Sequence, residues 1–256
     1  MPSRPYLLAE THWKSVKDTD YAVAVLPWGA TEAHNYHLPY ATDVIECDYI
    51  AAEAARIAWE SGVKVIVLPT VPFGVNTGQF DIRLDINMNP STQASVLRDV
   101  VASLSRQGFA KLVVLNGHGG NDFRQMIREI QPDYPQLFLS AINWYHVLDG
   151  KKYFDEPGDH AGEMETSVMM SIAADLLLPL SEAGTGSSRP FKLKGLREGW
   201  AWAQRDWVKA TVDTGVGDPS QASAAKGKVF LEELTRRIAG YLIGLAESDI
   251  NELYEE

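Results

Sequence analysis

Short apolar runs rich in β-branched residues alternate along this chain with longer helix-like segments, and no other feature restricts the possible folds as strongly. The predicted strands are Tyr21–Trp28, Lys64–Thr70, Lys111–Asn116 and Gln136–Asn143. The predicted helices are Val44–Ser61, Ser91–Gln107, Asp122–Gln131, Gly162–Leu178 and Ala222–Leu245. Such alternation is typical of a mostly parallel sheet covered by helices on both faces. The sequence therefore predicts an α/β fold, a three-layer α/β/α sandwich with a mostly parallel central sheet.

The predicted strands are apolar along almost their whole length, as expected when both faces of a parallel sheet are buried. In open sheets of this kind, ligands bind beyond the carboxyl ends of the strands. Glu32, His34 and Asp43 follow the first predicted strand, and His118 follows the third. We therefore expect these four side chains to converge at one edge of the sheet.

The length of the chain, 256 residues, suits one large α/β domain with a well-buried core, so residues 1–256 are predicted to form a single domain. Residues 184–218 are rich in Gly, Ser and Trp and show little periodicity. We expect an excursion or lid around the site at about 184–218. Trp200, Trp202 and Trp207 lie within it and could serve as packing residues, as subunit contacts or as the lining of a substrate pocket.

Charge and cysteine content argue against several classes of protein. A formal net charge of -11 disfavours a nucleic-acid binder, because affinity for nucleic acid depends on clustered Lys and Arg. No run approaches the roughly 20 apolar residues of a membrane helix, and residues 1–10 lack the apolar core of a signal peptide. Cys47 is the only cysteine, so no disulfide can form within the chain. A cytoplasmic location is therefore expected.

Two short segments combine carboxylates with imidazoles. The first, Gly29–Asp43, contains Glu32 and His34, whose side chains point the same way if the segment is extended. The second, Asn116–Asn121, contains His118 in a Gly-rich turn before a predicted helix. Carboxylates and imidazoles are suitable ligands for zinc or manganese, so the two segments suggest a metal-dependent hydrolase. The backbone N–H groups of the Gly-rich turn could also bind an oxyanion or an anionic substrate group.

Three separated blocks of the sequence resemble the creatininase family of metal-dependent amidohydrolases. These blocks are Leu26–Asp43, Asn116–Asn121 and His160–Ser167, and their order and spacing match the family over about the first two thirds of the chain. The family includes creatinine amidohydrolase, formamide hydrolases of cofactor pathways and a peptide-processing enzyme of mycofactocin formation. The resemblance implies a creatininase-like fold, a divalent metal cofactor and a homo-oligomer, with a hexamer suggested.

The resemblance also implies a site for two metal ions. Glu32 and His118 would hold one ion and His34 the other, with Asp43 bridging both. Two ions a few Å apart can lower the pKa of a water molecule and polarise an amide carbonyl. Zn2+ is the expected ion, and Mn2+ is an alternative at one of the two positions.

Glu165 is the candidate for the remaining carboxylate ligand of the second ion. The creatinine enzyme has a glutamate ligand two positions after the histidine of the second block, where this chain has Gly120. Glu163 is the alternative, since two residues that are two positions apart on a helix point to different faces. His160, or a carboxylate such as Glu165, is the candidate catalytic group that delivers a proton to the leaving nitrogen. A structural hydrogen bond to the backbone is the alternative role for His160.

These residues predict a hydrolase that opens a C–N bond other than a peptide bond, in a small cyclic amide or a formamide, by a metal-activated water. One alternative is a formamide or peptide-processing hydrolase of a cofactor pathway, and another is a catalytically inactive metal-binding member. A metal-dependent phosphoesterase also fits paired ions, but few basic residues lie beside the motifs. The expected partners are a small-molecule amide substrate and copies of the same chain, with no nucleic acid and no membrane.

Overall fold

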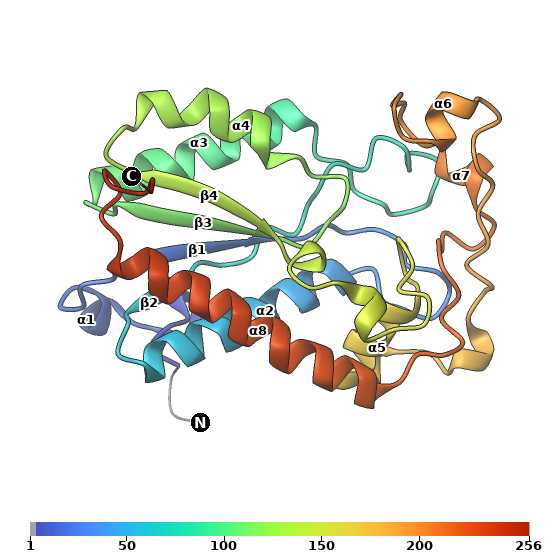
Figure 1. The fold of residues 1–256 in the computed structure, drawn as a ribbon, viewed down its shortest axis with the longest axis horizontal. Helices are drawn as coiled ribbons and strands as arrows, with labels where there is room; N and C mark the ends of the chain where they lie inside the picture. The colour runs from blue at the N-terminus through green and yellow to red at the C-terminus, as the bar shows by residue number, and fades with distance from the viewer. Residues whose placement is uncertain (1–3, 256) are drawn as a thin grey trace.

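The computed structural model describes residues 4–255 and has a four-stranded parallel sheet at its centre (Figure 1). The strands lie in the order β2-β1-β3-β4 and are β1 (Val23–Trp28), β2 (Val65–Val67), β3 (Lys111–Asn116) and β4 (Phe138–Asn143). Every neighbouring pair is parallel. The predicted parallel sheet is therefore confirmed. Strand β2 ends earlier than predicted, ahead of Pro69, which has no N–H to donate to a sheet.

Within residues 4–255, five helices have eight or more residues. They are α2 (Thr42–Glu60), α3 (Pro90–Arg106), α4 (Phe123–Ile130), α5 (Glu163–Ile172) and α8 (Ala224–Glu247). The single-turn helices are α1 (Trp13–Val16), α6 (Lys194–Arg197) and α7 (Trp207–Ala210). The 3-10 turns are Leu8–Glu10, Gln131–Asp133, Trp144–His146, Gly150–Lys152, Ala174–Leu176 and Leu180–Glu182. None of the helices within residues 4–255 combines the length and hydropathy needed to span a bilayer.

Helix α5 is shorter than the predicted Gly162–Leu178. It ends at Ile172 because Ala173 leaves the helical conformation, with φ -149° and ψ 41°. A single 3-10 turn follows, and Pro179 cannot continue a helix. The predicted end of this helix is therefore wrong, because the apolar residues continue past the point at which the backbone turns.

Alternate residues of the strands belong to two separate apolar cores, as the pleat of a β-strand requires. Val23 and Val25 of β1 share one core with α2 and α8. Ala24 and Leu26 belong to the other core, with α3 and α4. Figure 1 shows α3 and α4 on one side of the sheet and α2 and α8 on the other. The three-layer α/β/α arrangement predicted from the sequence is thus confirmed.

The strand order places a topological switch point between β1 and β3. The chain runs from β1 to β2 on one side and from α3 to β3 on the other, so the loops that follow β1 and β3 diverge. Ligands of open α/β sheets bind in the crevice that such loops form. Gly29 brings the loop after β1 close to α2, since a Cβ there would lie 2.8 Å from the amide nitrogen of Val44. The first turn of α2 therefore lies beside both loops.

Residues 184–218 extend past the carboxyl ends of the strands, where Figure 1 shows α6 and α7. The start of this segment is held by the loop after β1, because the side-chain oxygen of Asn35 accepts a hydrogen bond from the Gly184 amide at 2.8 Å. Asn35 has a φ of +54°, a left-handed conformation that Asn tolerates better than most residues.

Candidate metal centre

Within residues 4–255, six side chains with metal-binding atoms gather at the switch point from the three sequence blocks. They are Glu32, His34, Asp43, His118, His160 and Glu165. Their ligand atoms form three groups, and within each group all atoms lie inside 4.8 Å of one another. The four side chains expected to converge do so, and His160 and Glu165 join them.

Two of these groups share the carboxylate of Asp43. We call Glu32, Asp43 and His118 the Glu32 cluster, and His34, Asp43 and Glu165 the Glu165 cluster. The third group consists of Glu32, His34 and His160, so it draws on one ligand from each cluster and adds His160.

Asp43 lies between the two clusters and presents one carboxylate oxygen to each. Its Oδ1 lies 2.8 Å from His34 Nε2, and its Oδ2 lies 3.1 Å from His118 Nδ1. The side chain is almost fully buried. A carboxylate in this position could contact two cations at once and offset part of their mutual repulsion.

Each of the three histidines has one ring nitrogen held by a backbone carbonyl. His34 Nδ1 lies 3.1 Å from the Glu32 carbonyl, and His118 Nε2 lies 3.1 Å from the Val75 carbonyl. The carbonyl of Ala33 holds His160 Nε2 in the same way, at 2.9 Å. A carbonyl can only accept, so these nitrogens carry protons and the opposite nitrogens are left for another partner. Histidine ligands of metal ions are commonly oriented by such contacts.

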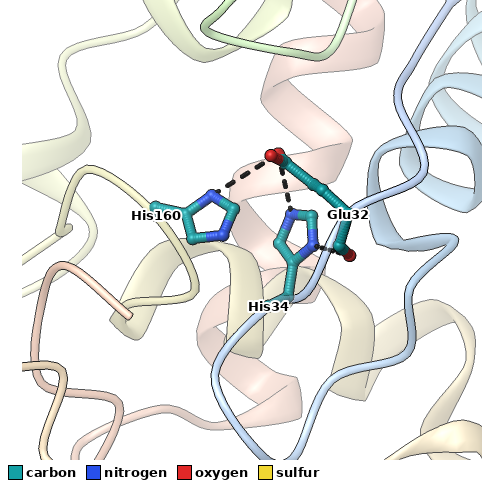
Figure 2. Close-up of side chains that lie close together, drawn as sticks. All are labelled: Glu32, His34 and His160. Carbon is teal, nitrogen blue, oxygen red and sulfur yellow. Dashed lines mark hydrogen bonds and ion pairs between the residues drawn. The ribbon is translucent and has the colours of Figure 1, made fainter. Parts of the chain in front are cut away.

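The carboxylate of Glu32 faces both His34 and His160, as Figure 2 shows. Its Oε1 lies 3.8 Å from His34 Nε2 and 3.7 Å from His160 Nδ1. The same oxygen lies 2.9 Å from His118 Nδ1. The other oxygen, Oε2, accepts a hydrogen bond from the side-chain amide of the buried Gln79. Gln79 therefore keeps Oε1 turned towards the histidines.

Glu163 and Glu165, two residues apart in the first turn of α5, point in different directions. Glu165 contributes an oxygen to the cluster with His34 and Asp43. Glu163 is instead bound to Lys226 of α8 and belongs to none of the three groups. The geometry favours Glu165 over Glu163 as a metal ligand.

The position two residues after His118 has no room for a side chain. A Cβ on Gly120 would lie 2.2 Å from the Val75 carbonyl oxygen and 2.4 Å from His118 Nε2. A carboxylate ligand therefore cannot come from residue 120 without moving the backbone. Glu165, from α5, supplies a carboxylate oxygen close to His34 and Asp43.

The buried carboxylates and imidazoles shift one another's pKa values. Burial alone would lower the pKa of His34, but Asp43 and Glu32 outweigh it and raise this pKa to about 10. The pKa of His118 is also raised well above its usual value, against the effect of burial, by Glu32 and Asp43. Burial would raise the pKa of Asp43, yet the two histidines hold it below its usual value. Protons on the histidines thus balance the carboxylate charge when no metal is bound.

The donor set fits a divalent transition metal. Imidazole nitrogens and carboxylate oxygens are usual ligands of zinc, and manganese also binds carboxylates and imidazoles. Asp43 Oδ2 is buried, and among residues 4–255 no donor approaches it with the geometry of a hydrogen bond. A buried oxygen of this kind calls for another partner, and a cation would supply one. The residues present therefore fit one divalent ion at each cluster.

His160 is enclosed by two aromatic rings. Its ring centroid lies 4.1 Å from that of His34 and 4.8 Å from that of Trp207. Because the Ala33 carbonyl holds Nε2, the ring presents Nδ1 towards Glu32. The hydrogen bond from His160 Nε2 to the backbone is therefore compatible with a catalytic role for His160, since Nδ1 remains available for a proton or a ligand bond.

A cleft of about 1480 Å³ opens over the clusters. Glu32, Asp43 and Glu165 belong to its lining, together with the loops that follow β3 and β4. Residues 188–210, which we call the roof segment, contribute much of the remaining lining, including Trp202 and Trp207. Trp200 lies outside the lining and is 76% exposed.

The roof segment is tied to the rest of the chain beside the clusters. The amide of Trp207 donates a hydrogen bond to the carbonyl of Gly78 at 3.0 Å. Arg205 forms an ion pair with Asp159, the residue before His160, at 2.8 Å. These contacts place the roof segment next to Gly78, which precedes Gln79, and next to His160.

Most of the chain is similar to one family of hydrolases. A family model described as creatinine amidohydrolase, of the creatininase family, matches residues 9–242. The mycofactocin precursor peptide peptidase of Mycobacterium tuberculosis is 30% identical over 239 residues, which cover 85% of each chain.

Solved structures show the same similarity. A protein of Bacteroides fragilis NCTC 9343 assigned as a creatinine amidohydrolase has a TM-score of 0.92 and 46% sequence identity, and the match covers 98% of this chain and 99% of that one. A structure described as creatininase Mn has a TM-score of 0.77 and covers 95% of this chain and 99% of that one. Its identity is 19%, so it supports the shared fold alone.

Proposed function

Because the chain belongs to the creatininase family, we propose that it is a hydrolase that cleaves an amide C–N bond with the help of two divalent metal ions. One observation carries the proposal: Asp43 turns one oxygen to His34 and the other to His118 at the edge of an open cleft. Two such ions would supply a water of lowered pKa and would polarise the amide carbonyl. We propose Zn2+ at both clusters, with Mn2+ as the alternative at one.

The protein side chains orient the reacting groups in this proposal. The ring of His160 is fixed at Nε2 by the Ala33 carbonyl and packed against Trp207, so Nδ1 keeps one direction. We assign to His160 the proton that the leaving nitrogen needs, because an imidazole can give and take protons near neutral pH. Gln79 keeps Glu32 in the orientation in which Oε1 faces the histidines.

The size of the cleft favours a substrate larger than a small cyclic amide. Pockets for drug-sized ligands are roughly 300–1,000 Å³, and this cleft is about 1480 Å³. The relative from Mycobacterium tuberculosis is named for a precursor peptide. A peptide is therefore our first candidate substrate. A small cyclic amide or a formamide is the second, supported by the creatinine amidohydrolase described by the matching family model.

The test combines metal analysis with turnover on a panel of amides. We expect two equivalents of divalent metal per chain, loss of activity on chelation, and recovery on adding Zn2+ or Mn2+. The panel contains short peptides, creatinine and an N-formyl amine, so that the two candidate substrate classes are compared directly. Full metal content without turnover of any amide would instead favour a metal-binding member without catalysis.

A further inference from the structure

The cleft lining outside the metal clusters is basic, although the net charge of the chain is -11. Seven Lys and Arg side chains line this outer part of the cleft, against four Asp side chains. The excess of positive charge is therefore local to the cleft. Fields of this kind concentrate ligands of opposite charge at a site.

Three of the seven cations are neutralised within the lining itself, by ion pairs to neighbouring aspartates. Within residues 4–255, the other four have no carboxylate oxygen within ion-pair distance: Lys151, Arg189, Lys192 and Arg197. Three of these four belong to the roof segment. A neutral substrate would leave all four without a counter-charge.

Two hydrogen bonds fix the backbone of the roof segment near these cations. Arg197 donates a hydrogen bond from its guanidinium to the carbonyl of Lys192 at 3.1 Å, which keeps the two residues side by side. The amide of Arg189 donates to the carbonyl of Ala210 at 2.7 Å. The backbone that carries the cations is therefore hydrogen-bonded at both ends of the stretch, and the guanidinium of Arg197 is held against it.

Metal loading would make the cleft more positive still. Glu32, Asp43 and Glu165 bring three negative charges to the clusters, and two divalent ions would more than balance them. The metal-loaded cleft would attract anions along its whole length, at its mouth as well as at its metal-binding end.

We infer that the substrate is an acidic peptide, one that carries a carboxylate bound by Arg189, Lys192 and Arg197 while its scissile amide lies at the metal clusters. The position of the amide rests on the proposed function, whereas the carboxylate site rests on the charges of the roof segment. Guanidinium groups suit this role because they bind carboxylates through two parallel hydrogen bonds. The carboxylate could belong to the C-terminus or to an Asp side chain of the peptide.

The test measures binding and turnover in parallel on the metal-loaded full chain. The probes are three peptides of one sequence: one with an Asp and a free C-terminus, one with the C-terminus amidated, and one with Asp replaced by Asn. We expect removal of the recognised carboxylate to raise Kd about tenfold, and the affected peptide identifies its source. The preference should shrink as ionic strength rises, because exposed charges are screened.

The variants locate the site on the roof segment. The triple variant Arg189→Gln, Lys192→Gln, Arg197→Gln should bind the three peptides with nearly equal Kd. Lys192→Gln alone should shift the preference in the same direction by a smaller factor, and it guards against misfolding of the triple variant. Lys194→Gln is the matched control, because Lys194 lies on α6, pairs with Glu198 and does not line the cleft.

The outcomes separate this inference from the proposed function. Equal binding of the three peptides, no detectable binding of any, or an unchanged preference in the well-folded variants would overturn the carboxylate site. Preferential binding without cleavage of any peptide would support the carboxylate site and count against peptide hydrolysis. Cleavage of all three peptides with equal Kd and equal kcat/KM would support hydrolysis and reject the inference.

Discussion

His34 Nε2 lies 2.8 Å from Asp43 Oδ1, and this contact joins the turn after β1 to the first turn of α2. The second oxygen of Asp43 faces His118, which follows β3. One side chain thus couples the two clusters. Loss of Asp43 should therefore disturb both metal positions, whereas loss of Glu165 should disturb one.

The first prediction concerns metal stoichiometry. Asp43→Asn is expected to remove both equivalents of metal, because the amide lacks the charge needed between two cations. Glu165→Gln is expected to remove about one equivalent and to leave the Glu32 cluster loaded. Metal content after dialysis, measured by inductively coupled plasma mass spectrometry, distinguishes these outcomes.

Glu163→Gln is the matched control, since it is the same substitution on the same helix two residues away. Glu163 is buried and bound to Lys226, so its loss should lower the free energy of unfolding by about 1–3 kcal/mol. Both metal equivalents should remain. If Glu163→Gln loses metal while Glu165→Gln keeps two equivalents, the assignment of Glu165 as ligand is wrong.

The second prediction is that metal uptake releases protons. In the metal-free protein the pKa of His34 is about 10 and that of His118 is also raised, so both rings hold two protons at neutral pH. A metal ion needs a ring nitrogen without its proton, and apparent metal affinity should therefore rise with pH. Calorimetry in two buffers of different ionisation enthalpy would measure about one proton released per ion. Absence of proton release would argue against histidine ligation.

The thermal stability of the metal-free protein should fall as the pH rises, whereas the apparent metal affinity should rise. The pKa of His34 rises from a usual 6.5 to about 10 on folding, so the folded chain binds an extra proton between these pH values. This contribution to stability is complete below pH 6.5 and is lost as the pH rises through 10. Thermal unfolding in chelator should therefore give a Tm that falls across this range, and His34→Gln should flatten the fall. A Tm that rises with pH would contradict the prediction.

The third prediction concerns Gln79, which donates a hydrogen bond to Glu32. Gln79→Leu should weaken metal binding at the Glu32 cluster by about 10–100-fold, the usual effect of removing a partner that orients a ligand. The Glu165 cluster should keep its affinity. Gln204→Leu is the control, because Gln204 also lines the cleft but bonds to Thr77 and to no candidate ligand. Competition with a chelator of known affinity measures both sites, and equal affinities in the two variants would refute a positioning role.

The layered fold could be predicted because burial on both faces of a sheet imposes a pattern on contiguous residues. The convergence of Glu32, His34, Asp43 and His118 could be predicted for a related reason. Parallel strands end at one edge, so residues just after them must lie near one another. Both arguments use only the residue pattern along the chain and the rules of sheet topology.

Gln79 and the cations of the roof segment could not be found in this way. Gln79 lies 47 residues from Glu32, in a loop whose sequence has neither helical nor strand periodicity. Few basic residues lie beside the motifs, because the cations of the cleft come mainly from residues 188–210, which fold back over the motifs. Such contacts depend on the path of irregular backbone, and no local pattern encodes that path.

The fourth prediction separates two roles of Asn35, which combines a φ of +54° with side-chain hydrogen bonds to the backbone of Gly184. Asn35→Gly removes the side-chain bonds, keeps the left-handed backbone accessible and adds the larger entropy loss of a glycine on folding. Asn35→Ala removes the same bonds and adds the cost of a left-handed Ala, about 1–2 kcal/mol. The Ala variant should therefore unfold at lower denaturant than the Gly variant, and hydrogen exchange near Gly184 should accelerate in both. Equal stability of the two variants would show that the left-handed backbone is not required, whereas unchanged exchange would show that Asn35 does not anchor the start of residues 184–218.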